Sequence, residues 1–271
     1  SNLLFDCPEG NQRQLMKSNV SLVKIKNVFI SHMHADHFLG LFGWIATMTL
    51  NDRRDKLTIF SPRGGKQKIQ RIMKEIIKPS FEIEYKEVKT GIILKEENFS
   101  ISAFALKHEI ACFGFVFREK DKEGEFDRKK AEKLGIPPGP MYSKLIAGKK
   151  VKIGKKTFTK KDVMNYNKKR VGRKIVFVSD TRPINTTITK AMGADLLIHE
   201  SSFLEDHQQN AIDSLHSTAR EAANIAKKAK VKQLALFHFS ARLDDVKEIQ
   251  KEAKSVFTNS VVVKDFDEIK L

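Results

Sequence analysis

The chain has 271 residues, of which 41% are hydrophobic, and a formal net charge of +17 at pH 7. This length and composition suit one large domain or two small ones with a sizeable core. They exclude a membrane-spanning protein, because no apolar run approaches the roughly 20 residues that a membrane helix needs. The charge implies a polyanionic partner, either a nucleic acid or a membrane surface.

The first residues and the cysteines are typical of a protein that stays in a reducing compartment inside the cell. Residues Ser1–Asp6 lack the basic start and the small-residue cleavage site of a signal peptide. The two cysteines, Cys7 and Cys112, stand in unrelated contexts and form no CxxC pair. We therefore expect a cytoplasmic protein whose thiols are free and packed, rather than joined in a disulfide.

Along the chain, short apolar runs rich in β-branched residues alternate with helical or polar stretches. The runs that predict strands are Lys26–Ser31, Lys56–Ser61, Ser100–Leu106, Phe113–Phe117, Lys174–Ser179, Asp195–His199 and Gln233–Phe237. Apolar spacing predicts a helix over Gly65–Ile77. A second helix is predicted over Thr218–Val231, with Thr218 as its N-cap and Glu221 completing a capping box. Interleaved strands and helices indicate an α/β protein with sheets covered by helices.

One segment, Glu119–Arg173, breaks this pattern. It contains Pro137-Pro138-Gly139-Pro140 and scattered glycines, so we expect an inserted, partly extended arm. From Arg118 to Lys174 there are 20 Lys/Arg and 7 Asp/Glu, a net charge of +13. Most of the chain's excess charge is therefore concentrated here, as in an electrostatic contact surface. A flexible solvated loop without a partner is the alternative.

The most specific motif is the HxHxDH stretch His32-Met33-His34-Ala35-Asp36-His37, which directly follows a predicted strand. Imidazole nitrogen and carboxylate oxygen are ligands that zinc accepts. Two histidines two residues apart in an extended turn can face one metal, while Asp36 and His37 can reach a second. The motif therefore predicts a metal centre.

Further candidate residues follow other predicted strands. These are His108, Asp180, His199, Glu200 and His238. In open α/β sheets, functional sites gather outside the carboxyl ends of the strands. One such histidine is more often structural, but several of them beside an HxHxDH loop indicate a single shared site.

The HxHxDH motif resembles the signature of the metallo-β-lactamase superfamily. More narrowly, the chain resembles ribonuclease Z, the family of tRNA 3′-processing endoribonucleases. The stretches that carry this resemblance are LLFDCPEGNQRQLM, SHMHADHFLGL, LKHEIACFGF, VSDTRP, HESSF, HSTAREAANIAKKA and HFSAR. They extend from the start of the chain to about Arg242, and the HST and HESSF motifs narrow the superfamily to this family.

The resemblance implies two zinc ions per subunit. Its ligands would be His32, His34 and His108 for the first ion, Asp36, His37 and His238 for the second, and Asp180 between the two. Such a pair clamps an in-line displacement at phosphorus and acidifies a bridging water. Asp36 would orient or deprotonate the nucleophile, and His216, held by Glu200, would contact the phosphate or protonate the leaving 3′-oxygen. The products would be a tRNA 3′-hydroxyl and a trailer with a 5′-phosphate.

The resemblance also implies an architecture and a partner. The fold would be the αβ/βα four-layer sandwich of the superfamily, formed by residues 1–271 as a single domain. Residues 119–173 would be the inserted basic arm that grips precursor tRNA, which is recognised by its shape and its phosphates. The protein would be a cytoplasmic homodimer that binds no membrane.

Several residues keep more than one interpretation. Asp6 is either a turn residue or a hydrogen-bond partner of a ligand histidine, and His199 is expected to be structural. His207 is expected to be solvated. Arg182 and Arg242 follow ligands closely and either touch phosphate or pack.

The sequence also departs from the family pattern. Pro8 stands where Gly is usual, Phe42 where Pro is usual, and Leu243 where Tyr is common. Family members also usually open with further strands before Leu3, which this sequence does not show. None of these departures removes a predicted ligand.

Two other functions remain open. A different metallo-β-lactamase hydrolase, such as a lactonase or thioester hydrolase, shares HxHxDH but needs neither the basic arm nor the HST helix. A non-catalytic RNA-binding protein is the other, and the complete ligand set argues against it.

Overall fold

Two units divide the chain, and each has its own core. The computed structural model describes residues 2–240 and 245–271. The first unit comprises Ser1–Arg118 and Arg173–Leu271, and the second comprises Glu119–Gly172. Arg242 and Leu243, which the sequence patterns singled out, lie outside the described residues.

The first sheet of the larger unit is parallel and has four strands. Its order is β1 (Asn2–Phe5), β2 (Ile25–Phe29), β3 (Leu57–Ser61) and β4 (Ile83–Glu87). Four helices belong to this half, namely α1 (Asn11–Lys17), α2 (Ala35–Phe38), α3 (Gly40–Leu50) and α4 (Gly65–Ile76), and η1 (Leu22–Lys24) is a 3₁₀ turn. Trp44 and Ile45 of α3 and Ile69 of α4 pack on Val28 and Ile59, so these helices cover one face of the sheet.

The second sheet has seven strands. Its order is β15 (Ser260–Val262), β14 (Leu234–Phe237), β13 (Leu196–Glu200), β12 (Lys174–Val178), β7 (Phe113–Glu119), β6 (Phe99–Ala105) and β5 (Gly91–Lys95). Strands β12 to β15 are parallel, and β7 pairs antiparallel with β12. The helices of this half are α8 (Asn185–Ala191), α9 (Gln208–Asp213), α10 (Ala219–Lys228) and α11 (Val246–Val256), with the 3₁₀ turn η3 (Glu205–His207).

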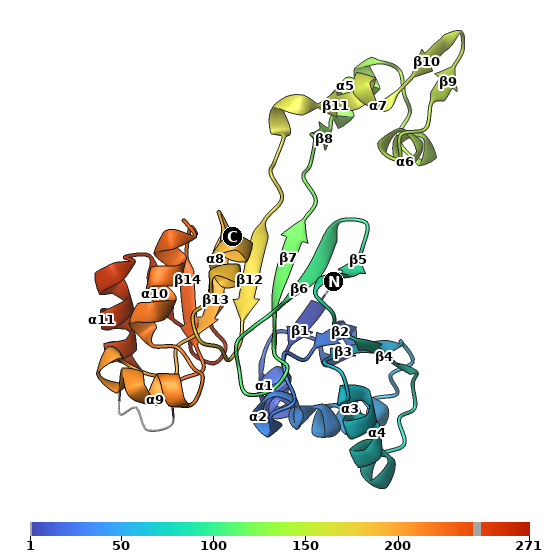
Figure 1. Ribbon diagram of the computed structural model, residues 1–271. Coiled ribbons are helices and arrows are strands. Elements are labelled where there is room, and N and C mark those ends of the chain that lie inside the picture. Colours follow the sequence, from blue (N-terminus) through green and yellow to red (C-terminus); the bar gives the residue numbers. More distant parts are fainter. Residues whose placement is uncertain (1, 241–244) are drawn as a thin grey trace. The chain divides into compact units, whose positions relative to one another are not determined.

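An aromatic core separates the two sheets. Phe5, Phe29 and Phe60 come from the first sheet, and Phe115 and Phe177 come from the second. Phe29 stacks on Phe60 with ring centroids 4.6 Å apart, and Phe5 stacks on Phe177 at 5.5 Å. A third core lies between the second sheet and α8, α10 and α11. Helix, sheet, sheet and helix therefore form four layers (Figure 1), which confirms the predicted sandwich.

The predicted strands and both predicted helices are present, with boundaries that shift by a few residues. Thr218 caps α10, and Glu221 completes the capping box as predicted. Small residues on α10, including Ala222 and Ala226, let the helix approach the sheet closely. The sequence analysis did not predict β1, β4 and β15, which are short or half-buried strands. It also did not predict α3, because this helix is apolar on most of its surface and gives no clear helical period.

The second unit is more folded than the partly extended arm that the sequence predicted. It contains α5 (Arg128–Lys133), α6 (Pro140–Ile146) and α7 (Lys160–Val163), the strand pairs β8 (Glu125–Phe126) with β11 (Met164–Asn165) and β9 (Val151–Ile153) with β10 (Lys156–Phe158), and the 3₁₀ turn η2 (Tyr166–Lys168). Ile136, Leu145, Phe158 and Val163 are buried together in a core of its own. Apolar residues scattered among lysines hid this core, because no single element has a strong period.

Both cysteines are free and buried, which confirms the expectation of packed thiols. None of the described helices has the length and apolar character that crossing a membrane requires.

Gly40 marks a close approach that the fold needs. Its backbone N–H donates to the Cys7 carbonyl oxygen at 2.9 Å, and an added Cβ would lie 1.9 Å from the Pro8 carbonyl oxygen. Backbone atoms cannot move aside as a flexible side chain can. We expect Gly40→Ala to lower the free energy of unfolding by at least about 2 kcal/mol, as overpacking does, measured by urea denaturation.

Gly43, also in α3, is the matched control. A Cβ there would meet only the end of the Gln12 side chain at 3.1 Å, and Ala is favoured over Gly in a helix by about 1 kcal/mol. Gly43→Ala should therefore be neutral or stabilising. Equal effects of the two substitutions would show that the packing of Gly40 against Pro8 is unimportant.

Candidate metal centre

The candidate ligands lie in the segments that directly follow β2, β6, β12 and β14. The parallel strands β12, β13 and β14 end at the same edge of the sheet, which brings Asp180, Glu200 and His238 together. The loop after β2 carries His32 and His34 and enters α2, which holds Asp36 and His37. The folding of the two sheets against each other therefore assembles one cluster from segments more than 200 residues apart.

Three histidines and a carboxylate form the first group. The Nδ1 atom of His34 lies 3.0 Å from His32 Nε2 and 3.2 Å from His108 Nε2. Asp180 Oδ2 lies 3.6 Å from His32 Nε2 and 3.9 Å from His108 Nε2. A tetrahedral site with bonds of about 2.0–2.1 Å has ligand atoms about 3.4 Å apart. The four atoms thus have the spacing that surrounds a single cation.

Asp36, His37 and His238 form the second group. Asp36 Oδ2 lies 3.6 Å from His37 Nε2 and 3.7 Å from His238 Nε2. Asp180 contacts this group as well, since its Oδ2 is 3.4 Å from His37 Nε2 and its Oδ1 is 3.6 Å from His238 Nε2. Asp180 therefore lies between the two groups.

An unsatisfied nitrogen shows that a metal fits here. His37 Nε2 is buried and makes no hydrogen bond with any described residue. A buried polar atom without a partner is costly unless something else satisfies it. The ligand atoms are imidazole nitrogens and carboxylate oxygens, which suit zinc and similar divalent cations.

The charges of the cluster lead to the same conclusion. Burial lowers the pKa of His37, but the nearby carboxylates of Asp180 and Asp6 outweigh it and raise the value to about 10. The interaction with His238 is the main cause that lowers the pKa of Asp36 to about 2. Burial lowers the pKa of His32 to about 3. The ionised carboxylates around His37 are therefore stabilised by a positive charge among them, which is either a proton on His37 or a bound cation.

The Asp6 carboxylate contacts Ser31 and His37, which belong to the segment that carries the HxHxDH motif. It has a positive φ of 56° and is buried. Its carboxylate accepts hydrogen bonds from Ser31 N at 2.7 Å and Ser31 Oγ at 2.8 Å, and it lies 2.8 Å from His37 Nδ1. The Ser31 hydroxyl in turn lies 3.0 Å from His32 Nδ1. Of the two interpretations of Asp6, the structure supports the hydrogen-bond partner of a candidate ligand histidine, because Asp6 contacts His37 directly and reaches His32 through Ser31.

We expect Asp6→Asn to weaken metal binding by about 10–100-fold, the usual cost of losing a hydrogen-bond partner of a ligand histidine. An amide nitrogen in place of Asp6 Oδ2 is a donor, and it can accept neither from Ser31 Oγ nor from His37 Nδ1. Competition with a fluorescent zinc chelator measures the dissociation constants. The exposed neighbour Glu9 supplies the control, Glu9→Gln, and unchanged affinity in Asp6→Asn would contradict this role.

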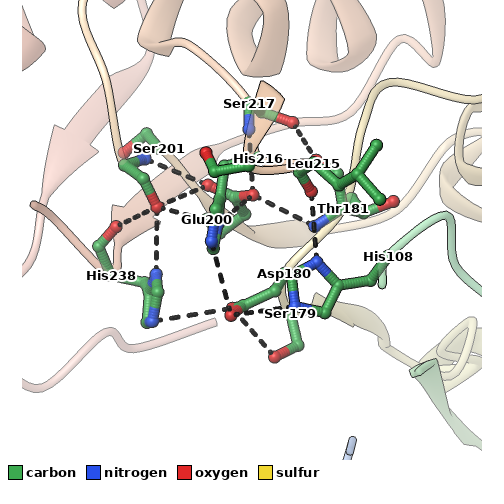
Figure 2. Close-up of polar contacts among 12 residues, drawn as sticks. His108, Ser179, Asp180, Thr181, Glu200, Ser201, Leu215, His216, Ser217 and His238 are labelled. Atoms are coloured by element: carbon green, nitrogen blue, oxygen red, sulfur yellow. Dashed lines mark hydrogen bonds and ion pairs between the residues drawn. The ribbon is translucent and has the colours of Figure 1, made fainter. Parts of the chain in front are cut away.

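Glu200 and His216 form a pair beside the metal groups. Glu200 is fully buried, and its Oε1 lies 3.1 Å from His216 Nδ1 and accepts from Thr181 N at 3.0 Å and Ser217 N at 2.9 Å. Figure 2 shows His216 with Glu200 on one side and Asp180 on the other. His216 Nε2 lies 4.0 Å from Asp180 Oδ2. The imidazole therefore faces the space where Asp180 joins the two groups.

The Ser202 hydroxyl is a contact that sequence reasoning missed. It donates to Glu200 Oε2 at 3.0 Å and lies 3.1 Å from His216 Nδ1 and 3.0 Å from His238 Nδ1. Ser31 and Ser202 were both overlooked because a serine next to a ligand is common and carries no spacing signal. Their positions inside quoted motifs were the available hint.

Two other histidines lie apart from these groups. His199 is fully buried, and its Nδ1 is 2.7 Å from the Glu200 carbonyl oxygen. His207 is exposed in η3.

A third group of candidate ligands consists of Asp180, His216 and His238, whose ligand atoms are close enough to share an ion. Proximity alone therefore allows His216 a ligand role as well as a catalytic one.

Known proteins resemble the chain over nearly its whole length. It is 42% identical to ribonuclease Z of Archaeoglobus fulgidus over 97% of this chain and 86% of that protein. Identity with ribonuclease Z of Methanosarcina acetivorans is 39%, covering 99% and 88%. Residues 1–118 also match the family model described as anti-Pycsar protein Apyc1.

Solved structures agree with this similarity. The short form of human tRNase Z superposes with a TM-score of 0.70 at 26% identity, covering 99% of this chain and 87% of that chain. A metallo-β-lactamase fold protein of Bacillus subtilis, 20% identical with a TM-score of 0.67 over 98% of this chain and 85% of that chain, shares the fold. The ribonuclease Z relatives are similar to the chain along nearly its whole length, and the chain shares its fold with human tRNase Z. The chain therefore belongs to the ribonuclease Z family.

Proposed function

We propose that the protein is a zinc-dependent endoribonuclease that removes the 3′ trailer from precursor tRNA. The observation that carries this function is the pair of ligand groups joined by Asp180, with the Glu200–His216 pair beside it. Two metal sites are suited to displacement at phosphorus. The names of the relatives, ribonuclease Z and tRNase Z, supply the substrate class.

Two zinc ions per subunit fit the described residues. His32, His34 and His108 would hold the first, Asp36, His37 and His238 the second, and Asp180 would contact both. Bound there, the ions would supply positive charge that stabilises the phosphorane-like transition state and makes a water more acidic.

The chain's own side chains handle the protons. An oxygen from water bonds to phosphorus as the bond from phosphorus to the tRNA 3′-oxygen breaks. The Asp36 carboxylate has a lowered pKa of about 2, so it is ionised at neutral pH but is a weak base. It orients the attacking water and takes up its proton as the new bond to phosphorus forms. His216 gives its proton to the leaving 3′-oxygen. The products are a tRNA 3′-hydroxyl and a trailer that carries a 5′-phosphate.

Glu200 keeps His216 ready for this role. Burial lowers the pKa of His216, but the hydrogen bond and the charge of Glu200 outweigh it and raise the pKa above its ordinary value. A larger fraction of the imidazole is then protonated near neutral pH. Because Nδ1 faces Glu200, Nε2 is the atom that can donate toward the substrate.

We assign the second unit the role of holding the tRNA body. Residues 119–172 contain 17 Lys/Arg and 7 Asp/Glu. A groove on this unit is lined by three lysines and one carboxylate, together with apolar and polar side chains: Lys130, Lys156, Lys161, Asp162, Leu134, Thr157 and Phe158. This excess of lysines suits a sugar-phosphate backbone, which is recognised by shape and charge. We further propose a cytoplasmic homodimer, by analogy with the family.

One assay tests the reaction. A 3′-extended tRNA is incubated with the zinc-loaded protein, with and without a chelator, and both product ends are mapped. We expect a single cut beside the acceptor stem that leaves a 3′-hydroxyl and a 5′-phosphate, and its loss with chelator. Hydrolysis of lactones or thioesters without any cutting of the RNA would instead support the rival hydrolase.

A further inference from the structure

The loop that carries His216 has a strained backbone. Leu215, the residue before His216, has a positive φ of 57°, which is uncommon for a residue other than Gly. Such a conformation costs on the order of 1–3 kcal/mol and persists only where surrounding contacts enforce it. The contacts around residues 215–218 therefore determine where the imidazole points.

Several of these contacts come from the rest of the site. The Leu215 carbonyl oxygen lies 3.3 Å from His108 Nδ1. Ser217 donates its N–H to Glu200 Oε1 at 2.9 Å and its hydroxyl to the Thr181 carbonyl oxygen at 2.6 Å. These contacts hold the peptides on either side of His216 but leave its own carbonyl to another donor.

That donor is Arg182, two residues after Asp180. Its Nη1 donates to the His216 carbonyl oxygen and, at 2.9 Å, to Glu221 Oε2, while its Nη2 donates to Glu221 Oε1. Both side chains of this ion pair are largely buried, with 14% of Arg182 and 15% of Glu221 exposed. A planar guanidinium reaching three acceptors forms a rigid connection.

Glu221 is fixed in its turn by the start of α10. Its Oε2 accepts from Thr218 N at 2.9 Å, as part of the capping box. The backbone N–H of Arg182 donates to the Lys107 carbonyl oxygen at 2.9 Å, next to the predicted ligand His108. Arg182 thus connects the Asp180 loop, the His108 loop and the His216 loop through one residue.

We propose that Arg182, held by Glu221, is a positioning residue that fixes His216 for proton donation to the leaving oxygen. This inference rests on the proposed role of His216. The guanidinium acts through the His216 carbonyl and does not touch the substrate. A lysine at this position would not replace it, because one ammonium cannot reach both Glu221 oxygens and the His216 carbonyl in the same plane.

The leaving group separates positioning from a general structural role. The tRNA 3′-oxygen is a poor leaving group that needs a proton, whereas the p-nitrophenolate of bis(p-nitrophenyl) phosphate departs without one. We expect Arg182→Ala to lower kcat on precursor tRNA about 10–100-fold, that is, up to the lower end of the roughly 10²–10⁴-fold that general acid catalysis contributes, because His216 is misplaced and not removed. KM for the tRNA, hydrolysis of the activated ester and zinc content should change by less than about threefold.

Matched variants sharpen the test. Arg182→Lys should behave like Arg182→Ala. Glu221→Gln, which keeps an oxygen for Thr218 N, should show a smaller loss in the same direction. Arg220→Ala removes another ion pair of the same helix, with Glu205, and should leave both substrates unaffected. Adding His216→Ala to Arg182→Ala should give no further loss beyond His216→Ala alone, because residues that act as a unit are not additive.

Three results would overturn the inference. The first is an equal loss of tRNA cutting and ester hydrolysis in both Arg182→Ala and Glu221→Gln, or loss of zinc, either of which shows a structural role. The second is a multiplicative effect of Arg182→Ala and His216→Ala. The third is an equal slowing of both substrates by His216→Ala itself, which would remove the acid role. A wild-type protein that cuts no tRNA would instead refute the proposed function.

Discussion

Asp180→Asn should reduce cutting of precursor tRNA by on the order of 10³-fold or more, at least as much as the loss of a major electrostatic group in an active site. The Asp180 carboxylate lies within 4.0 Å of nitrogen atoms of five histidines. Four of them belong to the two ligand groups, and the fifth is His216. Asn keeps the shape of the side chain but removes the charge and one acceptor oxygen. Both metal sites should therefore lose affinity together, rather than one of them alone.

The measurement pairs cleavage rates with zinc content determined by mass spectrometry. Asp52→Asn is the matched control, because Asp52 is exposed and has a positive φ of 50° that Asn also tolerates. It should retain full activity and metal. An Asp180→Asn protein that kept two zinc ions and cut tRNA within tenfold of the wild type would contradict the shared position of this carboxylate.

Removal of the second unit should lower kcat/KM for precursor tRNA by about 10²–10³-fold, because many phosphates of the tRNA would no longer be neutralised by lysine and arginine. The structure indicates where to cut. Lys122 and Arg170 pair antiparallel, each donating its N–H to the other's carbonyl oxygen at 2.9 Å. Replacing residues 123–169 with Asn-Gly would join Lys122 to Arg170 through a two-residue hairpin turn. Hydrolysis of bis(p-nitrophenyl) phosphate should stay within about twofold of the wild type.

A second variant keeps the unit folded and removes charge alone. In Lys130→Gln/Lys156→Gln/Lys161→Gln, the three lysines that line the groove are neutralised, while the buried residues of the unit are untouched. We expect weaker tRNA binding and a shallower dependence of affinity on salt, by about one unit of slope for each phosphate that a lysine no longer neutralises. If shortening the unit impaired both substrates equally, the unit would serve stability and not substrate binding.

Much of this protein could be predicted from its sequence, because the informative features are local. The apolar runs of β-branched residues predicted the strands of both sheets that are buried on two faces. Thr218 and Glu221 predicted the start of α10, since a capping box involves neighbouring residues. The HxHxDH loop identified the metal chemistry, because imidazoles and carboxylates at this spacing have few structural uses.

Other features depend on residues that only the folded chain brings together. Asp6 could be assigned to the ligands only once β1 paired with β2 and placed its carboxylate beside Ser31 and His37. The core of the second unit was hidden, because isolated apolar residues among lysines give no periodic signal.

The hydrogen bond from Arg182 to the His216 carbonyl joins residues 34 positions apart through a strained loop. Residue type and spacing therefore determined which groups could act on a phosphodiester. Tertiary structure decided which of them meet and at what angle, because long-range hydrogen bonds depend on how whole strands and helices pack.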